Sequence, residues 1–326
     1  MNRITRRLFL AASSFVAVAL GAGPASAADS LTLAWSPAPQ TPQIDVALAQ
    51  SLFQKAGLDV SVVTFATGRE AFEALTGGQA DLATMAELPA VTGALRDQRF
   101  SVIADLARYE GSRIITKRSS GIASPVDLAE RRIGVTLGTN TDFFLGKVLD
   151  QAGVTAEIVN AAPSDLVPAL LRGDVEAIVP FPNAYPAAAR ALGDDYLEIS
   201  SDLYQPHYIL TASPEALESK GDAISRFLGA LVEADTIVAD QPDAAADAVV
   251  ATVQGNIDAA AVKGIWEDTD ISVQLNASLL DLMVQQGAWI VGRGVVNASA
   301  PTLETLRPFV EPGPLQSVSA NSVSLD

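Results

Sequence analysis

The chain has 326 residues, 49% of them apolar, and its 38 acidic and 21 basic residues give a formal net charge of −17. This apolar content is enough for a buried core and excludes a disordered chain, and the length favours two structural units over one. An acidic surface repels nucleic acid and anionic lipid, so neither is expected as a partner.

Residues 1–27 have the pattern of a cleaved export signal. Arg6-Arg7 precedes an apolar run that ends at Leu20, and the small residues Ala25-Ser26-Ala27 follow. The run is too short to span a membrane, and the paired arginines resemble the twin-arginine export motif. The chain contains no Cys, which excludes both a lipid anchor and disulfides. We therefore expect a soluble periplasmic protein that begins at Ala28.

Beyond this signal, apolar strand-like runs alternate with helical patterns. The expected strands are 31–35, 60–65, 82–85, 102–106, 132–137, 157–160 and 177–179. The expected helices are 43–56, 70–76, 88–95, 141–151, 165–171 and, almost without a break, 214–287. This order predicts an α/β fold with open, mostly parallel sheets. The polar C-terminal segment, residues 313–326, is expected to fray.

One stretch of the chain is present twice. The sequence EALTGGQADLATMAELP starts at Glu73, and PALLRGDVEAIVPFPN starts at Pro168. Both read as a helix end, a Gly, an acid, a short apolar strand and a loop with Pro. Upstream, LFQKAGLDVSVVTFA from Leu52 matches VLDQAGVTAEIVNAA from Val148. We infer a structural duplication, with one α/β half in each of two lobes.

The duplication predicts how the chain is divided. Residues 28–112 and 208–326 form the first lobe with its C-terminal helices, and residues 113–207 form the second. The chain crosses between the lobes at 112–118 and 206–212, which would act as hinges. Ligands of open α/β sheets bind beyond the carboxyl ends of the strands, so the facing loops predict a ligand cleft between the lobes.

Several motifs resemble a known family, the solute-binding proteins of nitrate, taurine and aliphatic-sulfonate ABC importers, whose superfamily includes pyrimidine-precursor proteins. The resemblance runs from about residue 31 to 212, and more loosely to 289. It is carried by the two Gly-acid joints and by Gly121-Ile122, Asp127-Leu128, Ile133-Gly134-Val135 and Gly138-Thr139. It implies a monomer with a two-lobed periplasmic-binding-protein fold of type II, which passes a small polar, anionic or zwitterionic solute to an inner-membrane permease. The resemblance implies neither catalysis nor a cofactor.

Loop–helix junctions supply the candidate ligand contacts. Thr67-Gly68-Arg69-Glu70 and Gly138-Thr139-Asn140-Thr141-Asp142 both read as capped helix starts, whose N–H groups and positive dipole ends favour anions. Arg69 offers a bidentate cation, and three aromatic residues offer stacking surfaces. The full candidate set is Trp35, Gln40, Thr67, Gly68, Arg69, Ala86, Glu87, Gly138, Thr139, Asn140, Thr141, Phe181, Asn183, Tyr185 and His207.

Glu87 departs from the family pattern, because small residues are usual at this place in the loop. A buried carboxylate needs a partner, which is either Arg69 or an N–H donor of the ligand. The second alternative predicts an amino-sulfonate or another zwitterionic or N–H-bearing solute. The second joint also departs from the pattern, since it reads Phe181-Pro182-Asn183-Ala184-Tyr185.

Motifs for catalysis or metal binding are weak. A catalytic triad would have to use His207, the single His, and the chain has neither a G-x-S-x-G elbow nor a phosphate-binding G-x-x-x-x-G-K loop. Clusters of Cys and His are lacking, and residues 267–270 read as a solvated acidic turn. An enzyme of the pyrimidine-precursor branch and a ligand-sensing receptor module remain the alternatives to a transport protein.

Overall fold

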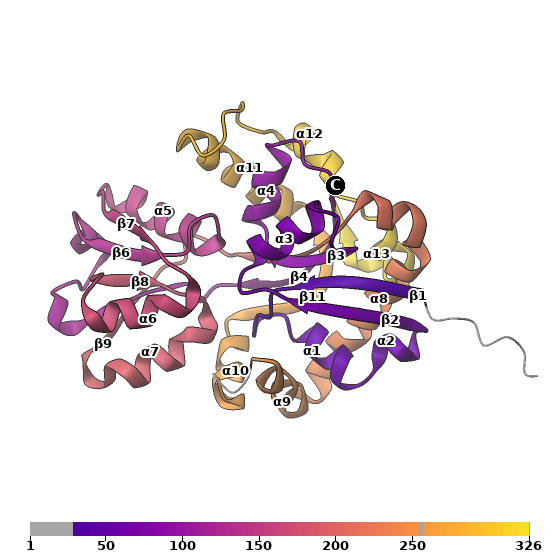
Figure 1. The fold of residues 1–326 in the computed structure, drawn as a ribbon, viewed down its shortest axis with the longest axis horizontal. Coiled ribbons are helices and arrows are strands. Elements are labelled where there is room, and N and C mark those ends of the chain that lie inside the picture. Colours follow the sequence, from indigo (N-terminus) through magenta and orange to yellow (C-terminus); the bar gives the residue numbers. More distant parts are fainter. Residues whose placement is uncertain (1–28, 254–256, 326) are drawn as a thin grey trace, which may run out of the picture.

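The computed structural model describes residues 29–253 and 257–325. Two separate β-sheets organise this part of the chain, and helices lie on both sides of each (Figure 1). The larger sheet has the strand order β12-β11-β4-β10-β3-β1-β2, and the smaller has the order β7-β6-β8-β5-β9. The predicted α/β fold with two open sheets is confirmed. The expected export signal, residues 1–27, lies outside the described residues.

The larger unit consists of the larger sheet and the helices packed on it. Its strands are β1 (Asp29–Trp35), β2 (Leu58–Thr64), β3 (Leu82–Ala86), β4 (Ser101–Tyr109), β10 (His207–Ala212), β11 (Thr269–Asn276) and β12 (Val323–Ser324). Its helices are α1 (Pro42–Ala49), α2 (Leu52–Lys55), α3 (Gly68–Thr76), α4 (Leu88–Ala94), α8 (Pro214–Asp240), α9 (Pro242–Thr252), α10 (Ala259–Trp266), α11 (Ala277–Gly292), α12 (Leu303–Leu306) and α13 (Gly313–Val318).

The smaller unit is continuous in sequence and lies at the left of Figure 1. Its strands are β5 (Arg113–Lys117), β6 (Arg132–Val135), β7 (Glu157–Asn160), β8 (Ala177–Val179) and β9 (Tyr196–Ser200). Its helices are α5 (Asn140–Ala152), α6 (Pro163–Arg172) and α7 (Tyr185–Leu192).

The repeated sequence stretches occupy equivalent places in the two units. In the larger sheet β1 lies between β2 and β3 and is parallel to both, with Leu33 opposite Val62 and Leu82. In the smaller sheet β6 lies in the same way between β7 and β8, with Ile133 opposite Ile158 and Ala177. The helix–Gly–strand joints recur because each helix must end before a strand that re-enters the sheet.

The two sheets continue from these parallel cores with antiparallel strands. β10 pairs antiparallel with β3 and β4, and β5 pairs antiparallel with β8 and β9. β3 and β4 are almost wholly buried because helices cover both faces, which explains their continuous apolar sequences. The chain leaves the larger sheet after β4 and returns to it at β10, so the connections between the units are residues 110–112 and 201–206. The segments expected to cross, 112–118 and 206–212, are mostly the strands β5 and β10.

A third contact joins the units beside the second connection. Trp289 of α11 lies against α5, where a Cβ added to Gly146 would stand 2.6 Å from the indole Cζ2. The ring of Phe143 meets Trp289 edge to face at 5.3 Å and Tyr204 at 5.0 Å. Gly is costly inside a helix, and here the close approach of the indole accounts for it.

Three expected features of the larger unit are wrong. The predicted helix 43–56 is divided at Ser51, which has a φ of 56°. The predicted helical region 214–287 is interrupted by the strand β11, which begins within the expected acidic turn 267–270. Asp270 of this strand forms an ion pair with Arg108. The C-terminal segment is packed, since Leu315 is buried and Val323 pairs with Leu275. Alternation of apolar residues along these short segments was too weak to reveal a strand.

Candidate ligand-binding site

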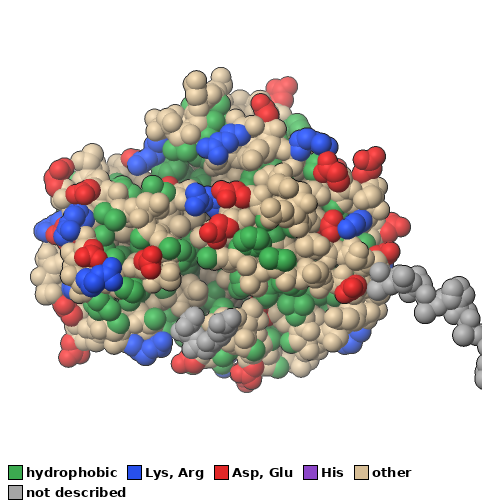
Figure 2. Space-filling model, viewed as in Figure 1, with side chains coloured by type: hydrophobic (Ala, Val, Ile, Leu, Met, Phe, Trp, Pro, Cys, Tyr) green, Lys and Arg blue, Asp and Glu red, His purple; other side chains and the backbone are tan. Residues whose placement is uncertain are grey.

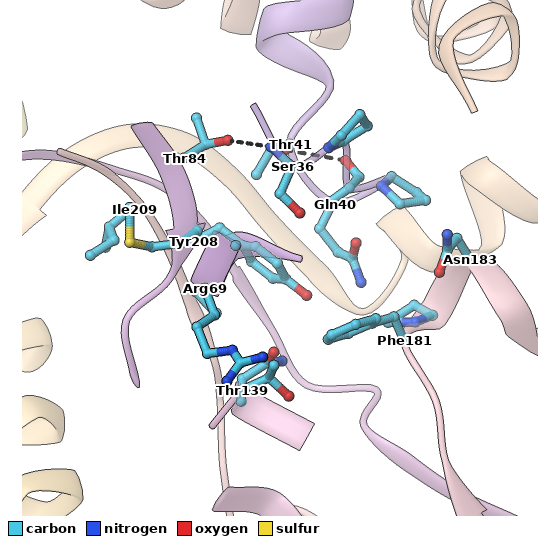
Figure 3. Close-up of a pocket in the computed structure, with 18 of the residues that line it drawn as sticks. Ser36, Gln40, Thr41, Arg69, Thr84, Thr139, Phe181, Asn183, Tyr208 and Ile209 are labelled. Atoms are coloured by element: carbon cyan, nitrogen blue, oxygen red, sulfur yellow. Dashed lines mark hydrogen bonds between the residues drawn. The ribbon is translucent and has the colours of Figure 1, made fainter. Parts of the chain in front are cut away.

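The principal cavity lies where loops of the two units face each other beyond the carboxyl ends of the parallel strands (Figure 3). It has an empty volume of about 740 Å³, which includes the part open to solvent. The larger unit contributes Ser36, Pro37, Ala38, Pro39, Gln40, Thr41, Ala66, Gly68, Arg69, Thr84, Met85, Ala86, Pro89, Leu106, Tyr208 and Ile209. The smaller unit contributes Thr139, Asn140, Pro163, Phe181, Pro182 and Asn183.

Gln40 is the most unusual residue of the cavity. Its side chain is fully buried, yet neither its amide oxygen nor its amide nitrogen has a hydrogen-bond partner among the described residues. Figure 3 shows this amide pointing into the space between Tyr208 and Phe181. Buried amides are normally satisfied, so both a donor and an acceptor here await a bound molecule.

Further polar groups of the cavity are also without protein partners. The Tyr208 hydroxyl and the side-chain amides of Asn140 and Asn183 form no hydrogen bonds within the part of the chain that the structure describes. Burial, with smaller contributions from Tyr109 and Glu87, raises the pKa of Tyr208 well above its ordinary value. The phenol therefore stays neutral and can donate its proton in a hydrogen bond.

The start of α5 brings a free backbone donor, the Asn140 N–H, to the same cavity. The N–H groups of Asn140 and Thr141 have no partner among the described residues, and Thr139, at the N-cap, provides no side-chain cap. The expected capping box at Gly138–Asp142 is therefore wrong. The hydroxyl of Thr139 instead donates to the Thr136 carbonyl at 2.7 Å, and Asp142 accepts from the Gly138 N–H at 3.0 Å. The helix dipole and the free donors favour an anion.

Arg69 stands at the rim of the cavity in the first turn of α3. The capping box predicted for this helix is confirmed: Thr67 accepts from the Glu70 N–H, and Glu70 accepts from the Thr67 N–H. The guanidinium of Arg69 forms no ion pair or hydrogen bond with another described residue, and its Cδ would lie 3.3 Å from a Cβ on Gly138. No described residue of the lining is an Asp or Glu, so the local charge is positive.

The structure brings eight of the fifteen candidate residues to the cavity, namely Gln40, Gly68, Arg69, Ala86, Thr139, Asn140, Phe181 and Asn183. The remaining seven do not line it. Trp35 ends β1 as expected, but its side chain is 2% exposed and belongs to the core. Thr67 and Thr141 are buried at the helix starts, and Gly138 faces the outer side of Arg69.

Tyr185 is buried beside a connection between the units rather than at the cavity. Its hydroxyl accepts from the Arg113 N–H at 3.1 Å and lies 3.4 Å from the Gly111 carbonyl oxygen. Pro182 turns the chain so that Phe181 and Asn183 face the cavity while Tyr185 faces inward.

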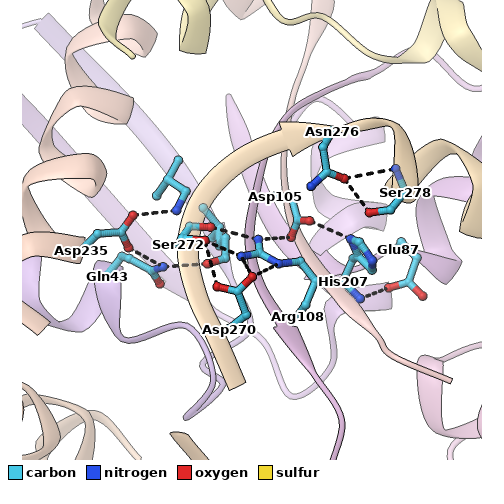
Figure 4. A network of polar contacts seen from close by, with 12 residues as sticks. Gln43, Glu87, Asp105, Arg108, His207, Asp235, Asp270, Ser272, Asn276 and Ser278 are labelled. Atoms are coloured by element: carbon cyan, nitrogen blue, oxygen red, sulfur yellow. Dashed lines mark hydrogen bonds and ion pairs between the residues drawn. The ribbon is translucent and has the colours of Figure 1, made fainter. Parts of the chain in front are cut away.

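Glu87 and His207 belong to a buried polar network in the larger unit (Figure 4). The Glu87 carboxylate accepts from the Tyr204 hydroxyl, from Gln286 and, at 3.0 Å, from the His207 backbone N–H. Burial raises the pKa of Glu87, and the interactions with His207 and Tyr204 offset only part of this rise. The partner is thus neither Arg69 nor a group in the cavity, and both alternatives drawn from the sequence miss the actual contact.

The same network continues through His207. Its Nδ1 lies 2.7 Å from Asp105, which lies 3.4 Å from Arg108. Because Tyr204 lies in the second connection between the units and His207 follows it directly at the start of β10, the network fixes where that connection enters the larger sheet.

Sequence reasoning overlooked part of the lining. The sequence places the loop after Trp35 at the cleft, but the candidate set leaves out Ser36, Pro37, Ala38 and Pro39, although the prolines are a signal of a turn at the sheet edge. Tyr208 had no such signal, since it reaches the cavity only because β10 lies between β3 and β4.

Comparison with known proteins agrees with this geometry. The sequence profile of the NMT1/THI5-like family matches residues 39–245, well over half of the chain. The chain belongs to the NMT1/THI5-like family. An aliphatic sulfonates-binding protein of Escherichia coli K12 is 27% identical over 187 residues, which cover 56% of this chain and 58% of that protein. The matched part of this chain therefore corresponds to little more than half the length of that relative.

Several solved structures resemble this NMT1/THI5-like protein in fold over most of its length. The aliphatic sulphonate-binding protein SsuA of Escherichia coli has a TM-score of 0.72 at 20% identity, covering 85% of this chain and 91% of its own. SsuA of Xanthomonas axonopodis pv. citri, bound to MOPS, has a TM-score of 0.74 at 16% identity, with coverage of 87% and 98%. The desulfurization enzyme DSZB has a TM-score of 0.67 at 17% identity, with coverage of 89% and 98%.

Within 29–253 and 257–325, no group of three or more His, Cys, Asp or Glu side chains is placed to hold a metal ion. None of the helices in these ranges has the length and hydropathy needed to cross a bilayer.

Proposed function

We propose that this member of the NMT1/THI5-like family is the substrate-binding component of an ABC importer, and that it captures a small sulfonate in the cavity between its two units. The observation that carries the proposal is the fully buried, unpaired amide of Gln40, in a cavity that Arg69 and the free backbone N–H of Asn140 also line. The names of the relatives support the sulfonate class.

The chemistry of the lining suits a sulfonate headgroup attached to a short apolar chain. Three sulfonate oxygens can accept from Arg69, from the backbone N–H of Asn140, and from the side-chain amides of Gln40 and Asn140. Phe181, Pro37 and Ile209 offer an apolar wall for the carbon chain. Nitrate would leave this wall and part of the donor set unused.

The placement of Glu87 changes the expected charge pattern of the solute. An amino group on the solute has no carboxylate to meet among the described lining residues, because Glu87 is used within the larger unit. We therefore favour a simple aliphatic sulfonate over a zwitterionic amino-sulfonate such as taurine.

Transport requires export, closure and a membrane partner. We propose that residues 1–27 direct the chain to the periplasm, that the lobes 28–112 with 208–326 and 113–207 close on the solute, and that the closed protein delivers the solute to a permease. Closure about the segments 110–112 and 201–206 would bring Arg69 and Asn140 onto one headgroup.

Titration calorimetry with butanesulfonate, taurine and nitrate tests the proposal, preceded by mass spectrometry of molecules retained by the purified protein. We expect butanesulfonate to bind most tightly. Arg69→Gln should weaken it about 10- to 100-fold, since a hydrogen bond to a charged group contributes about 1.5–3 kcal/mol. Arg118→Gln, which removes the same charge far from the cavity, is the matched control. Binding of a neutral or cationic solute alone would overturn the sulfonate proposal.

The enzyme alternative has weaker support. DSZB demonstrates that this fold can carry an enzyme. Here, however, the chain has no Cys, and His207 is buried outside the cavity against Asp105. Release of a new product from butanesulfonate during incubation would favour the enzyme over the binding protein.

A further inference from the structure

A second hollow lies on the outer side of Arg69, between α3, α4, the end of α11 and the loop that follows β6. Its empty volume is about 1230 Å³, counted in the same way as for the cavity. We name it the arginine groove, because Arg69, Arg96 and Arg293 all line it. Along the upper part of the junction between the two units, basic and acidic side chains lie together in Figure 2.

The three arginines are unusual in a chain with a net charge of −17. None of their guanidinium groups forms a hydrogen bond or ion pair with another residue in the described ranges, and Arg293 lies over the Trp289 ring at 5.0 Å. Two carboxylates, Glu73 and Asp142, also line the groove. Asp142 accepts from the Gly138 N–H and interacts electrostatically with Arg293, so both carboxylates oppose the three arginines and the arginines outnumber them by one.

The groove and the cavity share a wall. Arg69 and Pro89 line both, and the Arg69 side chain crosses from the larger unit to lie against Gly138 of the smaller unit. Gly138 has a φ of 74°, and a side chain there would press on Arg69 at 3.3 Å. The long, unpaired side chain of Arg69 and the ring of Pro89 therefore stand between the two spaces.

Resting on the proposed function, we propose that the arginine groove is the entry route for the anionic solute and that Arg69 separates it from the cavity. An anion that approaches an acidic protein meets long-range repulsion, and a local cluster of cations offsets it within about 10 Å at 0.1 M salt. Arg96 and Arg293 then raise the local anion concentration, and Arg69 transfers the headgroup inward.

Iodide quenching of tryptophan fluorescence tests the groove without any solute. Trp289 lines the groove, whereas Trp35 is buried and Trp266 donates its indole N–H to the Pro39 carbonyl. Subtracting the emission of Trp289→Phe isolates the groove signal, and neutral acrylamide corrects for changes in exposure. The ratio of iodide to acrylamide quenching should fall about twofold in Arg96→Gln and Arg293→Gln, and rise in Glu73→Gln.

Stopped-flow binding of butanesulfonate provides the kinetic test. Each of Arg96→Gln and Arg293→Gln should lower the association rate constant about two- to fivefold at low salt, with the effect lost at high salt. The dissociation rate constant should change little. Arg118→Gln, an exposed arginine on the smaller unit outside the groove, changes the net charge equally and should leave both measurements unaltered.

The outcomes separate the two proposals. If no sulfonate binds the native protein, the proposed function fails, while the quenching ratio still decides whether the groove concentrates anions. If butanesulfonate binds but the groove variants behave like Arg118→Gln in both measurements, the entry route is overturned and the binding function stands.

Discussion

The first loop of each repeated unit leads into a helix that starts at the cavity, but the two loops present different groups to it. In the larger unit the loop 36–41 leads into α1, whose first residue is Pro42, and it presents the side-chain amide of Gln40. In the smaller unit the loop 136–139 leads into α5 and presents the backbone N–H of Asn140. Equivalent positions thus supply a side-chain contact in one unit and a main-chain contact in the other.

The first helical turns differ in a second way, since each contains an acid. Asp45 of α1 is 3% exposed, and burial raises its pKa to about 7. Asp142 of α5 is less buried, its pKa is raised by burial, and the Gly138 N–H partly offsets the rise. In the larger unit, Asp45 is thus a poorly solvated carboxyl behind the loop 36–41. In the smaller unit, Asp142 instead stabilises the loop 136–139 by accepting a hydrogen bond from the Gly138 N–H.

The largest expected effect concerns Asp45. A carboxyl with a raised pKa in the folded state stabilises that state fully below pH 3.8, and this contribution is lost as the pH rises through about 7. The native protein should therefore lose up to about 4 kcal/mol of unfolding free energy between pH 4 and pH 8 from this group. Asp45→Asn should remove that loss in urea unfolding at several pH values. An equal effect of Asp142→Asn would erase the difference between the two helices.

The second prediction concerns Gln40, whose unpaired amide serves binding at the expense of folding. Gln40→Leu should weaken butanesulfonate about 10- to 100-fold and, because an unsatisfied buried group is removed, raise the unfolding free energy by about 1 kcal/mol. Calorimetry and urea unfolding on the same preparation measure both changes. A less stable variant with unaltered affinity would show that Gln40 supports the loop and not the solute.

The third prediction isolates the main-chain contact of the smaller unit. Asn140 is the first residue of α5, where Pro fits the helix and removes only an N–H that has no internal partner. Asn140→Pro should weaken butanesulfonate about tenfold more than Asn140→Ala, which keeps that N–H. Calorimetry of the pair, with circular dichroism to establish an intact fold, provides the measurement. Equal losses would assign the contact to the side chain.

The smallest effect is expected at α3, whose capping box is complete. Thr67→Ala should lower the unfolding free energy by about 1 kcal/mol, because the Glu70 N–H loses its acceptor. Its effect on butanesulfonate affinity should stay below about twofold, since Thr67 does not line the cavity. A tenfold loss of affinity would mean that capping and solute binding are coupled at this helix.

Trp35, Tyr185 and Glu87 illustrate where reasoning from sequence ended. Each was correctly expected near the end of a strand or joint, but only packing set the direction of the side chain. Trp35 packs in the core, and Tyr185 accepts a hydrogen bond from Arg113 beside a connection between the units. Glu87 accepts hydrogen bonds from Tyr204 and His207, which are far from it in sequence. A loop can be placed by its neighbours in sequence, whereas the face that a residue presents depends on what packs against it.

By itself, the sequence determined the α/β alternation, the two repeated units, the capping box at Thr67 and the loops that bear Arg69, Asn140 and Phe181. These follow from local rules: apolar period, helix stops, capping residues and the exit of loops at strand ends. Only the tertiary structure decided that Gln40 is buried without a partner, that Tyr208 reaches the cavity from β10, and that Arg69 lies over Gly138. Each of these depends on contacts between segments far apart in the chain, and burial and pairing across such distances leave no periodic trace in the sequence.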